Sequence, residues 1–218
     1  LRWDAAFYLE IARHGYDSLA QSALRFFPLV PGFARGISFV GIPVSSALLL
    51  VANVSALVAG MVLYRLARHE GFGVAAGTRA AWLLALSPAA FTLAMGYADA
   101  TAAALVIAAF LGLRRRQWAA AAVLGVLAGL VRPNAFLLAL PALIEVSRGW
   151  GAAGARERLA RVAAVLAAPV GTGLFLAWVG FAYSDPLLPY RVQTDPHLKG
   201  SFSNPFVTLS RATRGLFN

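Results

Sequence analysis

The chain has 218 residues, of which 60% are hydrophobic and only 13% are charged. Because a soluble domain carries roughly 25% charged residues, this composition indicates an integral membrane protein. The formal net charge of +10 does not indicate a nucleic-acid-binding protein, because the basic residues cluster between apolar stretches, as the positive-inside rule requires. The chain has no cysteine and three dispersed histidines, so no metal site is expected.

The first sixteen residues predict a short amphipathic helix lying at a membrane surface. Trp3, Phe7 and Ile11 recur at four-residue intervals, so they would lie on one face of that helix. Gly15 is expected to end the helix, since glycine accepts the left-handed backbone conformation found at helix ends. Asp4 stands in the first turn, where one interpretation is simply that an acid complements the helix dipole.

Residues 17–40 predict an ordered loop or several short interfacial helices, because two prolines and a glycine interrupt any long helix there. Six apolar stretches follow and predict a transmembrane bundle: residues 42–64, 79–98, 100–113, 118–131, 135–147 and 162–183. The second stretch has Ser87 and Pro88 at its centre, which predicts a kink. The alanines and glycines of the fourth stretch favour close packing against neighbouring helices.

The arginines between these stretches predict the orientation. Three loops carry three, three and four arginines and should therefore lie on the cytoplasmic side: residues 65–79, 114–117 and 148–161. The chain then divides into an outer loop with interfacial helices, a bundle of about six transmembrane helices, and a polar, loop-like outer tail: residues 1–40, 41–183 and 184–218. We expect a fragment that lacks flanking transmembrane helices.

Polar residues at the outer ends of the predicted helices would share one face of the bundle: Asp4, Tyr97, Asp99, Arg132, Asn134, Asp185 and Arg191. Asp99 and Arg132 adjoin short apolar stretches that cover only about 21 Å of a roughly 30 Å hydrocarbon core. Ionisable groups at such a depth mark either a site or a paired charge, so a purely structural ion pair between them is a second interpretation. Glu145 is expected to pair with Arg148 near the inner end.

Several segments resemble, in the same order, those of the phosphatidylinositol-glycan class V mannosyltransferases and their bacterial relatives. The first two are similar to parts of that family's first luminal loop, and the others are similar to its Ser-Pro segment, its aromatic–Ser–Glu turn, its Arg-x-Asn turn and a later Asp-Pro-Leu. In this chain they are Arg2-Trp3-Asp4, Phe26-Phe27-Pro28-Leu29, Ser87-Pro88, Tyr97-Ala98-Asp99, Arg132-Pro133-Asn134 and Asp185-Pro186-Leu187.

The resemblance implies an all-α, polytopic transmembrane helix bundle of the GT-C type. Such an enzyme takes a sugar, here favoured to be mannose, from a polyprenyl-phosphate donor and passes it to a lipid-linked, protein or glycan acceptor. The reaction would occur on the non-cytoplasmic face of a bacterial plasma membrane. The donor is a substrate, so no cofactor is implied, and the expected partners are this donor and membrane lipids.

The resemblance also implies residue roles. Asp4 would be the general base that takes the proton of the acceptor hydroxyl. Arg132 would bind the donor phosphate through its planar guanidinium, and Tyr97 and Asp99 would hydrogen-bond sugar hydroxyls. Further substrate-binding residues would be Asn134, Arg2, Asp185 and Arg191.

Two other classes of protein share some of these features. A multi-pass transporter or lipid flippase is the main alternative, because broken helices and intramembrane charges also occur in transporters. The hydropathy shows no convincing inverted repeat, however, and the outer charges have no counterpart deep in the inner half. A non-catalytic membrane scaffold is the other alternative, in which Asp4 only complements its helix dipole.

Overall fold

The computed structural model describes residues 1, 3–194 and 205–216. These residues form helices and turns, with no strand among them. The helices are α1 (Asp4–His14), α2 (Leu29–Ser38), α3 (Val44–His69), α4 (Val74–Leu86), α5 (Phe91–Ala94), α6 (Asp99–Arg114), α7 (Trp118–Val131), α8 (Ala139–Ser147), α9 (Ala155–Tyr183), α10 (Leu188–Arg191) and α11 (Pro205–Leu216). Short 3-10 helices occupy Gln21–Arg25, Pro133–Leu138 and Val192–Thr194. The predicted all-α membrane helix bundle is confirmed.

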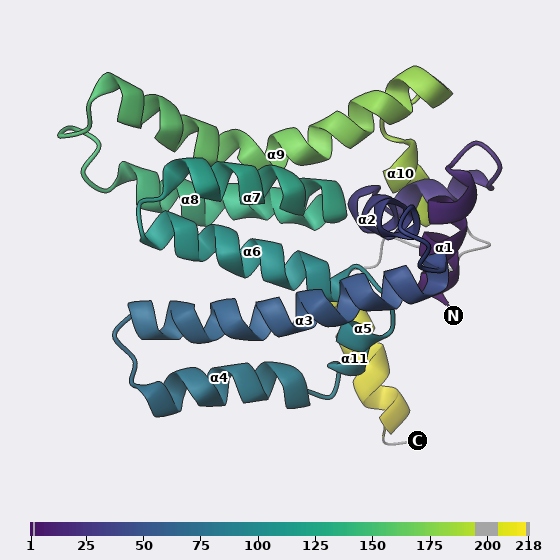
Figure 1. Ribbon diagram of the computed structural model, residues 1–218, viewed down its shortest axis with the longest axis horizontal. Helices are drawn as coiled ribbons and strands as arrows, with labels where there is room; N and C mark the ends of the chain where they lie inside the picture. The colour runs from purple at the N-terminus through teal and green to yellow at the C-terminus, as the bar shows by residue number, and fades with distance from the viewer. Residues whose placement is uncertain (2, 195–204, 217–218) are drawn as a thin grey trace.

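Helices α3, α4, α6, α7, α8 and α9 lie side by side along the long axis of the molecule (Figure 1). Among the described residues, α3 with 26 residues and α9 with 29 are long and apolar enough to cross a membrane. The connections α3–α4, α6–α7 and α8–α9 lie at one end, and α1, α2 and α10 lie at the other (Figure 1). We call the first the arginine end and the second the α1 end.

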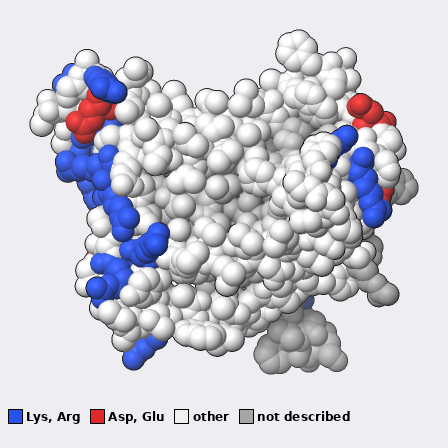
Figure 2. Space-filling view, viewed as in Figure 1, with Lys and Arg blue, Asp and Glu red and all other residues white. Residues whose placement is uncertain are grey.

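Arginine side chains gather along the arginine end in Figure 2, with a smaller acidic patch among them. The α1 end also carries both signs of charge but shows fewer basic atoms on this face. The surface between the two ends is almost free of charge on this face (Figure 2). Large apolar side chains are exposed on the bundle helices, among them Leu57 on α3, Leu83 on α4 and Leu140 on α8. Exposed apolar surface on this scale is typical of a protein whose surrounding solvent is lipid.

Helix α1 forms where the sequence predicted it and ends at Gly15, whose φ of 79° is in the left-handed region. Its buried face differs from the predicted stripe. Trp3 precedes the helix and is 69% exposed, and the buried residues are Ala5, Tyr8, Ile11 and Ala12. The buried face of α1 is shifted because α1 packs on α2 and on the first turns of α3.

The prediction of one kinked helix over 79–98 is wrong. Helix α4 begins earlier, at Val74, and ends at Leu86, after which Ser87 is extended with ψ of 148°. A residue before proline avoids the helical region because the proline ring clashes with its backbone, and the chain turns before the short α5. The Ser87 hydroxyl donates to the Leu84 carbonyl oxygen at 3.2 Å.

The later part of the chain also contains more helix than predicted. Helix α9 begins at Ala155, so the loop expected over 148–161 is shorter. The stretch predicted as 135–147 is a 3-10 helix followed by α8. The tail, predicted to be loop-like, contains α10, a 3-10 helix and α11.

Candidate functional site

A polar pocket of about 320 Å³ opens at the α1 end. Four separate segments line it: Asp4 and Tyr8 from α1, Arg25 and Phe26 from the following segment, Val131 at the end of α7 with the next three residues to Asn134, and Gln193 from the tail. Two larger pockets, of about 490 and 510 Å³, lie against α3, but neither is lined by a carboxylate. The smaller pocket is therefore the candidate site, because its side chains can transfer protons and bind charge.

Asp4 provides a free carboxylate to this pocket. It is the first residue of α1, directly after Trp3 with its positive φ of 53°. Its side chain is exposed, and it makes no hydrogen bond or ion pair with the part of the chain that the structure describes. Its position in the first helical turn suits the helix dipole, and its place at the pocket leaves the carboxylate available for chemistry.

Arg132 and Asp99 form an ion pair at the edge of the pocket. The Arg132 Nη2 atom lies 2.7 Å from the Asp99 Oδ2 atom, and the side chains are 34% and 30% exposed. Arg132 ends α7 in an extended conformation before Pro133, and Asp99 begins α6. The ion pair expected as the structural interpretation therefore exists, yet Arg132 still lines the pocket.

Two buried tyrosines lie within electrostatic reach of these charges. Burial raises the pKa of the Tyr8 hydroxyl well above its usual range, against the opposing effect of the nearby Arg132 guanidinium. Burial also raises the pKa of Tyr97, and the negative charges of Asp4 and Asp99 raise it further. Both hydroxyls therefore stay protonated at neutral pH and can donate hydrogen bonds.

Sequence reasoning missed Arg25 as a site residue. Its guanidinium carbon lies 4.8 Å from the ring centre of Phe26 and 5.4 Å from that of Phe7, and these two rings stack at 4.8 Å. Its Nε atom is buried and has no hydrogen-bond partner in the part of the chain that the structure describes. The available signal was its place directly before the Phe-Phe-Pro-Leu segment. Gln193, which also lines the pocket, had no such signal.

The remaining predicted residues lie differently. Asn134 is exposed and lines the pocket. Asp185 does not line it; its carboxylate accepts from the Leu187 N–H at 3.0 Å and pairs with Arg191 at 3.1 Å. Arg191 does not line the pocket either and is 70% exposed in its side chain. Arg2 lies outside the described residues. The structure thus unites Asp4, Arg132 and Asn134, with Asp99 held by Arg132.

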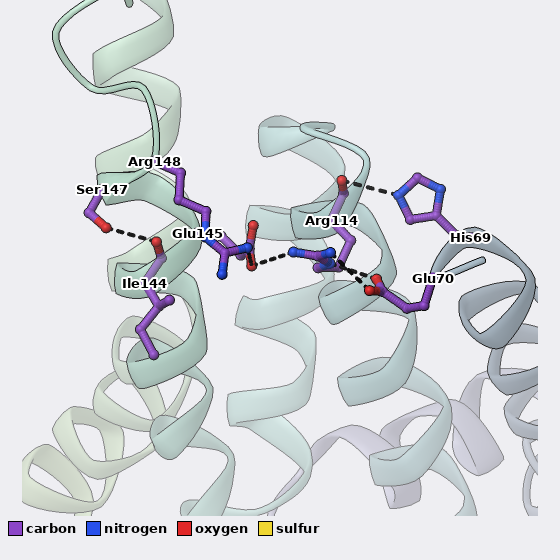
Figure 3. A network of polar contacts seen from close by, with 7 residues as sticks. All are labelled: His69, Glu70, Arg114, Ile144, Glu145, Ser147 and Arg148. Atoms are coloured by element: carbon purple, nitrogen blue, oxygen red, sulfur yellow. Dashed lines mark hydrogen bonds and ion pairs between the residues drawn. The ribbon is translucent and has the colours of Figure 1, made fainter. Parts of the chain in front are cut away.

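A second charged cluster, at the arginine end, is fully paired (Figure 3). Arg114 donates to both Glu70 oxygens at 2.6 and 2.8 Å and to Glu145 at 2.8 Å. Arg148 also donates to Glu145 at 2.8 Å, so the expected Glu145–Arg148 pair is confirmed. The hydrogen bond from Arg114 holds the pKa of Glu70 below its usual value. These contacts join the ends of α3, α6 and α8, and we interpret the cluster as structural.

Among the described residues, no group of three or more His, Cys, Asp or Glu side chains could hold a metal ion. The pocket instead combines one carboxylate, two guanidinium groups, one phenolic hydroxyl and two side-chain amides. Such groups can bind an anion and accept a proton from a hydroxyl. The fold and the site thus define an all-helical membrane protein with a polar pocket at one end of its bundle.

The sequence profile of glycosyltransferase family 87 matches residues 26–209, and the chain belongs to this family. No curated protein and no solved structure gave a significant match. The family assignment confirms the expected membrane glycosyltransferase. It does not support the narrower resemblance to the phosphatidylinositol-glycan class V enzymes. The matched range includes Asp99, Arg132 and Asn134 and begins after Asp4 and Arg25.

Proposed function

We propose that this protein transfers a mannosyl group from a polyprenyl-phosphate donor to an acceptor hydroxyl, with Asp4 as the general base. The observation that carries the proposal is the free Asp4 carboxylate in a pocket that Arg25 and Arg132 also line. Proton acceptance and phosphate binding, the two tasks of such a transfer, are thereby available within one pocket.

The proposed mannosyl transfer needs no reactant besides the donor and the acceptor. The acceptor oxygen bonds to the anomeric carbon of the donor sugar as the bond between that carbon and the phosphate oxygen breaks. The electron pair of the broken bond stays on the phosphate, and the acceptor proton passes to the Asp4 carboxylate. A positioned general base typically contributes about 10²–10⁴-fold to such a rate.

The donor phosphate would lie against the guanidinium groups. Arginine binds phosphate oxygens through two parallel N–H donors, and Arg132 keeps donors beyond the Nη2 that contacts Asp99. Asp99 and Tyr97 would then hydrogen-bond hydroxyls of the sugar, with Asn134 beside them. Asp185 and Arg191 pair with each other, and in this proposal they would act on substrate only if that pair opens.

The donor also suits the place of the pocket in the bundle. We propose that the bundle helices cross the membrane several times with the α1 end on the outer side, because basic residues gather at the other end (Figure 2). A pocket at a bundle end lies near the membrane surface, where the phosphate of a lipid-linked donor lies. The GT-C type of organisation and a bacterial plasma membrane are part of this proposal.

The test is transfer of labelled mannose from polyprenyl-phosphate mannose by the full-length protein, with Asp4→Asn as the variant. The amide keeps the shape of the side chain but cannot accept the proton, so turnover should fall about 10²–10⁴-fold. Glu10→Gln is the matched control, because Glu10 is on the same helix and, among the described residues, pairs only with Arg13 and His14 at the surface. Turnover by Asp4→Asn close to that of Glu10→Gln would refute the assignment and leave Asp4 as a helix-dipole residue.

A further inference from the structure

We propose that Arg25 is the principal ligand of the donor's lipid phosphate, an inference that rests on the proposed function and names the group recognising its substrate. Arg25 lines the pocket with Asp4, Tyr8 and Arg132. It comes from the loop after α1, whereas Arg132 comes from the end of α7. An anion in the pocket would therefore meet guanidinium groups from two separate elements.

The two arginines differ in how much of their charge is already neutralised. Arg132 is paired with Asp99 at 2.7 Å. Arg25 has no acidic partner among the described residues, and its guanidinium lies over the rings of Phe7 and Phe26. An aromatic ring attracts a cation without neutralising it. Arg25 thus keeps its full charge for an incoming anion.

The aromatic contacts also hold Arg25 in place. Phe26 is buried and stacks on Phe7, and Tyr8 meets Phe26 edge to face at 5.1 Å. The buried Arg25 Nε atom has no acceptor among the described residues, and a buried donor without a partner is energetically unfavourable. The fold therefore holds the guanidinium with unused hydrogen-bonding capacity, an arrangement expected of a preorganised anion ligand.

The reaction increases the negative charge that this ligand must stabilise. The donor is a phosphodiester with one negative charge, and the departing polyprenyl phosphate is a monoester that carries about −1.5 to −2 at neutral pH. A cation without an acidic partner binds the more highly charged state more strongly. Arg25 should therefore act more on turnover than on donor binding, since its interaction strengthens as the bond breaks.

The test compares Arg25→Gln and Arg25→Lys with Arg35→Gln in the full-length protein. Arg35 is an exposed residue of α2 that does not line the pocket, so its variant should match the wild type. Arg25→Gln should lower kcat/KM about 10- to 100-fold, mostly through kcat. Arg25→Lys keeps the charge but loses the planar stacking group, so its kcat/KM should lie between that of the wild type and that of Arg25→Gln. Wild-type kinetics for both Arg25 variants would overturn the inference while leaving the proposed function intact.

A binding experiment separates this inference from the proposed function. In an Asp4→Asn background, Arg25→Gln should weaken binding of long-chain polyprenyl phosphate about tenfold or more and leave binding of the same-length polyprenol unchanged. Equal weakening for both ligands would mean that Arg25 serves only packing, and would overturn the inference. Competition by inorganic phosphate as strong as that by polyprenyl phosphate would likewise overturn the inference, because the pocket would then be a free-phosphate site. Equally strong competition by phosphatidylglycerol vesicles would overturn it by showing a general site for anionic lipids. If binding depends on Arg25 but the wild type transfers no mannose, the proposed function fails and the phosphate site stands.

Discussion

The Arg132 guanidinium lies 2.7 Å from the Asp99 carboxylate and joins the end of α7 to the start of α6. The same guanidinium lines the pocket that contains Asp4. A structural role and a substrate-binding role thus coincide in one side chain. Arg132 can hold Asp99 with one nitrogen and present others to a ligand, because a guanidinium has five N–H donors in a fixed plane.

We predict that Arg132→Lys weakens use of the donor. A single ammonium group cannot reproduce the planar fork that would hold Asp99 and a phosphate together, so the KM for the donor should rise about tenfold. Donor titrations of the full-length enzyme measure this. Arg13→Lys is the control, since Arg13 pairs with Glu10 at the surface of α1. If KM and kcat both match the control, Arg132 serves only the ion pair.

We predict that the two ends of the bundle face opposite sides of the membrane. The chain has no cysteine, so single cysteines can be introduced at the exposed positions Ser18 and Gln117. A membrane-impermeant thiol reagent applied to intact cells should label Ser18→Cys and reach Gln117→Cys only after the cells are permeabilised. Labelling of both variants from the same side would refute the orientation and the outward-facing pocket.

We predict that the contact between α7 and α9 depends on glycine. A Cβ atom at Gly171 would collide with the backbone of Val126, whereas one at Gly173, on the same helix, would meet open space. Gly171→Ala should therefore lower the melting temperature, because packing in membranes depends on close approach of small residues. Gly173→Ala should leave it unchanged or raise it slightly, since alanine favours helix. The close contact would be refuted if both variants melted at the same temperature.

We predict a pH-dependent contribution of Glu70 to stability. Because Arg114 lowers the pKa of Glu70 below its ordinary value of 4.5 in the folded protein, the stabilisation is complete above that value. It is lost as the pH falls from 4.5 through the lowered folded value. Glu70→Gln should therefore melt below the wild type at pH 7, and the difference should shrink in acid. Glu10→Gln should show little difference, because its exposed ion pairs contribute little. A difference that did not vary with pH would contradict the prediction.

Much of the helical framework could be predicted from the sequence. The apolar stretches 100–113 and 118–131 correspond closely to α6 (Asp99–Arg114) and α7 (Trp118–Val131). They are bounded by arginine runs and Arg132-Pro133, where charge and the restricted backbone before proline end a helix. The Ser87-Pro88 break was located correctly but predicted as a kink, because sequence alone does not indicate whether neighbouring helices will support a continuous helix across a proline.

The composition and periodicity of this sequence determined its membrane class and the positions of most helices. Asp4, Arg132 and Asn134 became candidate residues through their places at the ends of apolar stretches and through the family resemblance. Only the tertiary structure decided that Arg25 joins them, that Asp99 pairs with Arg132, and that Asp185 and Arg191 pair with each other instead of lining the pocket. The physical reason is the separation along the chain of the residues that interact. Helix formation depends on residues three or four positions apart, whereas the pocket depends on which side chains meet after segments far apart in the chain have packed.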